Sequence, residues 1–279
     1  MYRSCLLIDV GSNPDRPRPG RLWLRNLYHV HQRLWMAFPS ENRKSHDRDF
    51  LKPFKPADFG EKPVQVERGA GSGFLFRIEP QPAGRVVILV QSNSAVKPDW
   101  DYAFHNARFL LNPLAAPPQV EEFDPRFAKG QQLRFRIRIN LSKKLKTSAK
   151  GVDLTKAGEG TDRQGRPKAQ SKRVALTWDK DQNPDDVIRK WFAAKGDQGG
   201  FQVETFRVLQ IGWGAGNRSD PRPAGDRMKF RSALLEGTLT VKDADSFRET
   251  IVGGIGHGKA FGFGLLSVAP RTPLPAEAT

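Results

Sequence analysis

The stretch Gln132-Leu133-Arg134-Phe135-Arg136-Ile137-Arg138-Ile139-Asn140-Leu141 alternates apolar and polar side chains over its whole length. Its odd-numbered positions are apolar, and three of its even-numbered positions are arginine. Successive side chains of a β-strand point to opposite faces, so this alternation predicts a strand with one buried face. The other face would be a row formed by Arg134, Arg136 and Arg138.

A strongly basic segment, Ser142–Arg173, follows this strand. It is too polar for a core, so we expect an extended loop or a hairpin. Its basic residues include Lys143, Lys144, Lys146, Lys150, Arg163, Arg166, Lys168, Lys172 and Arg173. The other elements expected in this half are a strand over 174–178, a helix over 184–192, strands over 201–212 and 230–241, a helix over 244–253 and a strand over 263–269. This order, βαββαβ, is typical of a ferredoxin-like domain.

The first half of the chain repeats this order in a weaker form. A strand over 2–10 precedes a single helix, Arg21–Phe38, which Pro- and Gly-containing sequences delimit. Strands over 73–79 and 85–92 are expected to pair as a hairpin, and a short helix over 102–111 follows them. This half therefore reads βαββ, with a weak αβ end.

A Pro-rich break at Asn112–Pro118 separates the two halves. The sequence predicts an α+β fold of two tandem ferredoxin-like (RRM-like) domains, with a basic β-hairpin inserted in the second. We expect the first domain to span 1–118 and the second 119–270. The Pro- and Ala-rich residues 271–279 are expected to form a disordered tail.

The charge of the chain points to a polyanionic partner. Lys and Arg outnumber Asp and Glu by 46 to 30, which gives a net charge of +16. Nucleic acid is the favoured partner, while a solubility charge or a genome-wide arginine bias is the bland alternative. No run of about 18 apolar residues predicts a membrane span, and Cys5 is the only cysteine, so an internal disulfide is excluded. We expect a cytoplasmic protein with no membrane partner.

The helix expected at Arg21–Phe38 places a histidine on an apolar face. Spacings of three and four align His31 with Tyr28, and with Leu24, Leu27, Leu34, Trp35 and Phe38. A histidine in such a stripe is often a core residue bonded to a backbone carbonyl. The functional alternative is an imidazole at a cleft, held by a phenol, that transfers protons. Helical spacing alone favours the core reading.

A glycine-rich segment, Gly253–Gly264, joins the last expected helix to the last strand. Glycines let a backbone approach a phosphate closely, which suggests that Gly256, Gly258 and Gly262 contact RNA. The segment lacks the Gly-Lys-Ser/Thr ending of a Walker loop. Lys259–Leu266 echoes an RNA-binding motif of RRM domains, although Ala260 and Gly264 replace residues of that motif. A tight helix-to-strand turn is the structural alternative.

Two long motifs resemble the CasE family, the CRISPR-associated endoribonucleases of type I-E systems. They are Leu27-Tyr28-His29-Val30-His31-Gln32-Arg33-Leu34-Trp35 and the segment from Gly254 to Pro270. Val90-Gln91-Ser92 and Phe135–Asn140 also look like landmarks of that family, so the resemblance spans nearly the whole chain. The loop Ser12–Gly20, the segment Ser40–Ala70 and the extended tail depart from the family pattern.

The resemblance implies a metal-independent endoribonuclease that binds the hairpin of a CRISPR repeat RNA. Cleavage at the 3′ base of the hairpin by 2′-OH attack would leave a 2′,3′-cyclic phosphate and a 5′-OH, with no cofactor. The family histidine carries over to His31 and the family tyrosine to Tyr28. Related enzymes retain the hairpin product and join the Cascade complex, so other Cascade subunits are implied partners.

Further site residues follow from the chemistry. Lys259 and Arg33 are candidate cations for the charged phosphorane, and His257 is a rival histidine. We expect RNA contacts from Arg33, Arg134, Arg136, Arg138, Lys143, Lys144, Lys146, Arg163, Arg166, Lys168, Lys172 and Arg173. Two alternatives stay open: a metal nuclease using Asp47/Asp49 or Asp243/Asp245, and a non-catalytic RRM-like RNA-binding protein.

Overall fold

The computed structural model describes residues 1–11, 19–38, 73–92, 97–105, 113–146, 171–216 and 228–271. Several sequence predictions lie outside the described residues. They concern residues 12–18 and the segment Ser40–Ala70, the Asp47/Asp49 pair, residues 106–111 of an expected helix, the tail after 271, and Lys150, Arg163, Arg166 and Lys168.

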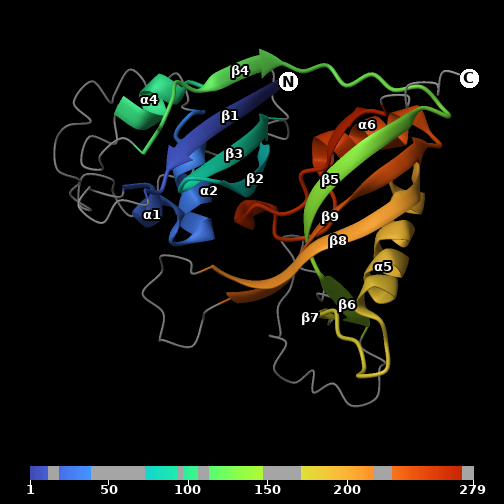
Figure 1. Ribbon diagram of the computed structural model, residues 1–279. Coiled ribbons are helices and arrows are strands. Elements are labelled where there is room, and N and C mark those ends of the chain that lie inside the picture. Colours follow the sequence, from blue (N-terminus) through green and yellow to red (C-terminus); the bar gives the residue numbers. More distant parts are fainter. Residues whose placement is uncertain are drawn as a thin grey trace, which may run out of the picture.

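Two four-stranded antiparallel sheets lie side by side (Figure 1). The N-terminal sheet has the order β2-β3-β1-β4. Its strands and their helices are β1 (Tyr2–Asp9), α1 (Pro19–Leu24), α2 (Leu27–Trp35), β2 (Phe74–Gln81), β3 (Arg85–Ser92), α4 (Trp100–His105) and β4 (Gln119–Glu122). Strands β1 and β3 pair over their full length, from Tyr2 opposite Ser92 to Asp9 opposite Arg85.

The C-terminal sheet has the order β10-β5-β9-β8. Its elements are β5 (Gln132–Asn140), α5 (Pro184–Gln198), β8 (Phe201–Gly216), β9 (Met228–Val241), α6 (Ala244–Gly253), the 3₁₀ turn η3 (Lys259–Phe261) and β10 (Ser267–Pro270). A separate two-stranded sheet, β6 (Ser142–Lys146) with β7 (Ser171–Ala175), is inserted between β5 and α5. Both four-stranded sheets run fourth-first-third-second in chain order, which confirms two tandem ferredoxin-like units with an inserted hairpin.

Each sheet packs one face against its own helices. The buried face of β5 consists of Leu133, Phe135, Ile137 and Ile139, as the alternation predicts, and it packs on α5 and α6. In the N-terminal unit, Leu6 and Ile8 of β1 pack with residues of α2 and β2. The opposite faces of the two sheets turn toward each other.

Several expected elements differ in detail from those of the structure. The expected helix Arg21–Phe38 is two helices, because Asn26 breaks it and caps α2. Strand β4 pairs with β1, so the N-terminal sheet extends past the predicted boundary at residue 118, while the division into two domains itself stays a prediction. The last strand begins at Ser267 rather than 263, since glycines with positive φ precede it. Strand β7 begins at Ser171 rather than 174.

Buried polar side chains join the two sheets. The Arg77 guanidinium of β2 donates through Nη1 to the carbonyl oxygens of Arg136, at 2.9 Å, and Leu265, at 3.0 Å. The Gln91 amide of β3 donates to the carbonyl oxygen of Ile251 at 2.7 Å. Because both side chains are only 2% exposed, these bonds fix the N-terminal sheet against β5 and the end of α6.

Candidate functional site

Helix α2 places the two candidate catalytic residues one turn apart. The Asn26 side chain accepts a hydrogen bond from the Tyr28 amide at 3.0 Å, which starts the helix there. Val30 and Leu34 are completely buried against the N-terminal sheet. Tyr28 and His31 lie on the adjoining face and are half-buried, so this face borders the core rather than filling it.

Aromatic rings surround the His31 imidazole. It stacks on Phe74 with a centroid distance of 5.0 Å and lies 6.2 Å from Phe76, both on β2. The Trp35 ring approaches it edge-on at 5.7 Å, and the Tyr28 ring lies 6.3 Å away. Tyr28 and Trp35 of the predicted stripe therefore lie beside His31, but the fully buried face of α2 consists of Val30 and Leu34, so the imidazole lies at the rim of the core.

The glycine-rich segment reaches this rim from the far end of the chain. Phe261 of η3 lies 5.8 Å from the Tyr28 ring, and η3 contacts both α2 and β2. Phe261 also lies 4.5 Å from Phe230 of β9. A continuous series of rings therefore connects the C-terminal sheet to Tyr28 and His31. The sequence did not predict a role for Phe230 or Phe261. The glycines of the segment Gly253–Gly264 drew attention to the part of the chain that contains Phe261, but no comparable signal marked Phe230.

The glycines of this segment have clear structural roles. Gly256, Gly258, Gly262 and Gly264 all have positive φ, a conformation that other residues rarely adopt. A Cβ on Gly262 would lie 3.0 Å from the Phe76 ring, and one on Gly264 would lie 2.5 Å from the carbonyl oxygen of Ile255. These requirements support the tight-turn interpretation, and RNA contacts by Gly256, Gly258 and Gly262 stay a prediction.

The candidate cations differ in how they are held. Lys259 lies in η3 with its side chain exposed, although partial burial lowers the pKa of its ammonium group. Arg33 instead donates to the Trp23 carbonyl oxygen, and burial lowers the pKa of its guanidinium. Arg33 therefore bridges α1 and α2, whereas Lys259 lies exposed on η3, the turn that contacts α2 and β2. The rival His257 is exposed, and His29 is half-buried.

The arginine row of β5 lies away from His31. Phe76 points toward α2, so its neighbour Arg77 points to the opposite face of the N-terminal sheet, toward β5. On that side, Arg136 pairs with Glu236 at 2.9 Å, and Arg138 donates to the Gln210 amide oxygen at 3.3 Å. Arg134 is exposed beside them in a shallow groove of about 610 Å³. The structure thus separates these arginines from the candidate catalytic residues.

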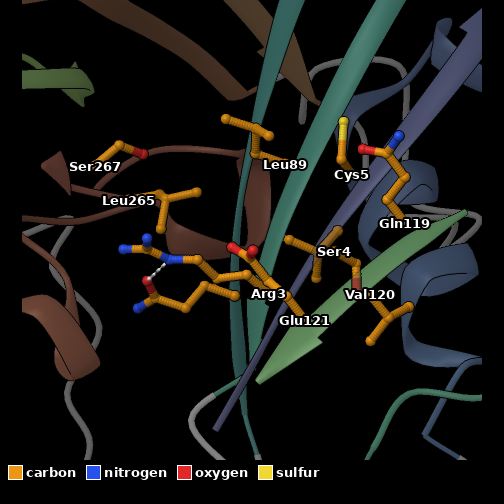
Figure 2. A pocket seen from close by; sticks show the side chains of 11 residues that line it. Arg3, Ser4, Cys5, Leu89, Gln119, Val120, Glu121, Leu265 and Ser267 are labelled. Carbon is orange, nitrogen blue, oxygen red and sulfur yellow. Dashed lines mark hydrogen bonds between the residues drawn. The ribbon is translucent and has the colours of Figure 1, made fainter. Parts of the chain in front are cut away.

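A smaller pocket, of about 290 Å³, opens between the two sheets (Figure 2). Its walls include Arg3 and Gln91 from the N-terminal sheet and Leu265 and Ser267 from the C-terminal side. The Arg3 guanidinium donates to the Gln91 amide oxygen at 3.4 Å and lies 3.2 Å over the Phe123 ring. Burial lowers the pKa of this guanidinium to about 10, so it remains charged at neutral pH.

The basic hairpin is described only at its base. Lys143 is exposed on β6, and Lys144, Lys146, Lys172 and Arg173 lie within β6 and β7.

Among the described residues, no three His, Cys, Asp or Glu side chains are grouped to hold a metal ion. The Asp243 carboxylate, a candidate metal ligand in the sequence, caps α6 by accepting a hydrogen bond from the Ser246 amide at 2.8 Å. Asp243 therefore has a structural role at the start of this helix. No described helix is long and apolar enough to cross a membrane.

Comparisons with known proteins agree with this arrangement. A curated relative, the CRISPR-associated endoribonuclease Cse3 of Thermus thermophilus, is 28% identical over 80% of this chain and 92% of its own. The Cascade subunit CasE of Escherichia coli is 24% identical over 90% of this chain and 95% of its own. A solved structure of Thermus thermophilus Cse3, bound to an RNA representing a pre-cleavage complex, superposes with a TM-score of 0.61 at 26% identity. That superposition covers 96% of this chain and 98% of the other.

The family model described as "CRISPR associated protein" matches residues 1–270, which is almost the whole chain. The chain therefore belongs to this family of CRISPR-associated proteins, and within it to the CasE group.

Proposed function

We propose that this protein is a metal-independent endoribonuclease that binds the stem-loop of a CRISPR repeat and cleaves the precursor RNA at the 3′ base of the hairpin. The observation that supports the proposal is that α2 carries Tyr28 and His31 one turn apart, and that η3, which contains Lys259, packs on Tyr28 through Phe261. Relatives named as CRISPR endoribonucleases, one of them solved with RNA, share this fold over nearly the whole chain.

The reaction is an in-line attack by a ribose 2′-OH on the adjacent phosphate. A new bond forms between the 2′-oxygen and phosphorus, and the bond to the 5′-oxygen breaks. The products are a 2′,3′-cyclic phosphate and a 5′-OH, so one proton leaves the 2′-OH and one reaches the 5′-oxygen. Histidine titrates near neutral pH and can serve in either transfer, which contributes about 10²- to 10⁴-fold.

The residues around His31 suit supporting roles. Its half-buried ring is fixed by Phe74 and Phe76, which orients the imidazole without a loss of entropy at the moment of reaction. Tyr28, one turn away, would orient the phosphate or act as the second proton donor or acceptor. The ammonium of Lys259 would stabilise the negative charge that develops on the phosphorane.

Binding is assigned mainly to the basic surface beyond this rim. An A-form stem is recognised through its phosphates and 2′-hydroxyls, which the net charge of +16 attracts. The β6–β7 hairpin, with Lys143 exposed at its base, is the favoured clamp on the stem. Because one relative is named as a Cascade subunit, we further propose that the protein keeps its product and joins such a complex.

Cleavage of a repeat hairpin in EDTA tests the proposal. The wild type should cut at the 3′ base of the stem, and His31→Ala should lower the single-turnover rate by about 10²- to 10⁴-fold with little change in RNA affinity. His257→Ala, which changes an exposed histidine of the glycine-rich segment, is the matched control and should cleave normally. A requirement for Mg²⁺, an unimpaired His31→Ala variant, or cleavage of RNA with a 2′-deoxy at the scissile position would each contradict the mechanism.

A further inference from the structure

The distal ends of β8 and β9 form an arm beyond the end of β5. The pairing of β5 with β9 ends at Asn140 opposite Ser232, whereas β8 and β9 continue from Trp213 opposite Arg231 to Gly216 opposite Met228. In Figure 1 this arm runs from the C-terminal sheet toward the N-terminal unit, and β8 contacts α2. The arm therefore reaches the neighbourhood of the candidate catalytic helix.

Three side chains form a layered stack on one face of this arm, which we call the Trp213 stack. The Arg231 guanidinium lies 3.4 Å over the Trp178 ring and 5.7 Å from the Trp213 ring. Its Nη1 donates to the carbonyl oxygen of Leu176 at 3.2 Å, which fixes its position. Trp178 follows β7, so the Trp213 stack stands beside the root of the basic hairpin.

The outermost ring of the Trp213 stack is open to solvent. Trp213 is 67% exposed, and Ile211 is the other large apolar side chain that is exposed among the described residues. Arg231 lies over one face of the indole, and the high exposure leaves the opposite face to water. A strand-held tryptophan with one open face contributes little to the core of its own chain, whereas such rings are favoured for recognition.

The opposite face of the arm contacts the candidate site. Phe230 is next to Arg231 in β9, so its side chain points to the other face, where it packs on Phe261. Phe261 in turn packs on Tyr28. The Trp213 stack and Phe230 therefore lie on opposite faces of the arm, and Phe230 connects through Phe261 to the rim. An RNA strand that leaves the rim would cross the arm to reach the Trp213 stack.

We propose that Trp213 is a stacking platform for an unpaired nucleotide of the bound RNA, with Arg231 holding the ring from behind and adding positive charge. This assignment rests on the proposed function, because it takes the occupant to be the RNA substrate. Paired bases inside a stem present no free face, so the nucleotide must lie in a loop or in a flank of the stem. Stacking on an aromatic side chain tolerates every base, because each has a π-face.

A binding assay with matched variants tests the platform. The probes are two repeat stem-loops with a 2′-deoxy at the scissile position, one trimmed to the stem-loop and one with its unpaired flanks, and a single-stranded oligonucleotide. Trp213→Ala should weaken binding of at least one RNA with unpaired nucleotides by about 5- to 140-fold. Trp213→Phe should restore most of the affinity, and Ile211→Ala, on the same strand, should bind like the wild type.

The outcomes separate the two proposals. If the wild type cleaves the repeat hairpin but Trp213→Ala binds all three RNAs normally, the platform is overturned and the proposed function stands. If the wild type does not cleave the repeat but Trp213→Ala weakens single-strand binding and Trp213→Phe restores it, the proposed function fails and the platform survives. Because Trp213 is largely exposed, unchanged thermal unfolding of the variants should show that they are folded.

Discussion

The two faces of strand β2 serve opposite purposes. One face presents Phe74 and Phe76 to α2, where they stack on His31. The other face presents Leu75 and Arg77 to the C-terminal unit, where a Cβ on Gly254 would lie 2.7 Å from Leu75. Since neighbouring residues of a strand alternate, one strand both supports the candidate site and closes the interface between the sheets.

Basic side chains at the two faces of β2 differ in how far they are buried and paired. On the interface face, Arg77 and Arg138 are buried or half-buried and bond to carbonyl or amide oxygens, and Arg136 pairs with Glu236. On the site face, the rim consists mainly of aromatic rings, and the exposed Lys259 belongs to the adjoining turn η3. Net charge attracts RNA to the whole molecule, but burial and pairing decide which cations are available to it.

Replacing the interface arginine should give the largest effect on stability. The Arg77 side chain is 2% exposed and donates to Glu79 at 2.7 Å as well as to two carbonyl oxygens across the interface. Arg77→Met would leave these acceptors buried without their donor, which should lower the free energy of unfolding by about 3–5 kcal/mol. Urea denaturation measures the change.

Arg207→Met is the control for that variant. The Arg207 side chain is 74% exposed and its 3.5 Å contact with Glu236 is on the surface, so the variant should lose less than about 1 kcal/mol. Equal losses in the two variants would show that the interface face of β2 is not held by Arg77.

A substitution in the glycine-rich segment should have an intermediate effect on stability, and it should also slow cleavage by disturbing the side chains around His31. Gly262→Ala forces a side chain into positive φ and places its Cβ 3.0 Å from the Phe76 ring, so we expect a loss of about 1–3 kcal/mol. Displacing Phe76 should also disturb His31 and slow cleavage more than it weakens RNA binding. Chemical denaturation and single-turnover cleavage measure the two effects.

Gly253→Ala is the matched control for Gly262→Ala. Gly253 ends α6 with no atom within 4 Å of an added Cβ, so stability should be unchanged or slightly higher. A Gly262→Ala variant that is as stable and as active as this control would show that the segment does not support the site face.

Local pattern predicted the elements with regular periodicity. The alternation in β5, the hairpin of β2 and β3, and helix α6 were all visible in the sequence, because each depends on nearby residues. The break at Asn26 was hidden, since apolar residues continue on both sides of it. Strand β4 was missed because its four residues are mostly exposed and gain their structure only by pairing with β1.

The candidate site was likewise predicted only in part from the sequence. Helical spacing placed Tyr28 and His31 together, and the density of glycines marked the segment Gly253–Gly264. No local signal showed that Phe261 packs on Tyr28, or that Trp178, Arg231 and Trp213 form a stack. These contacts join distant parts of the chain, and only the tertiary fold brings them together.

The smallest effect expected concerns Arg134, which the sequence marked for RNA binding. It is exposed on β5, on the face turned away from His31, so Arg134→Gln should change the affinity for the repeat hairpin by less than about twofold. Lys143→Gln, at the root of the basic hairpin, should weaken binding at low salt and reduce the slope of log affinity against log salt by about one. Titrations at several salt concentrations compare the two variants. If Arg134→Gln lowers the salt slope as much as Lys143→Gln does, the RNA extends onto the arginine-bearing face of β5, and RNA binding is not confined to the surface beyond the rim.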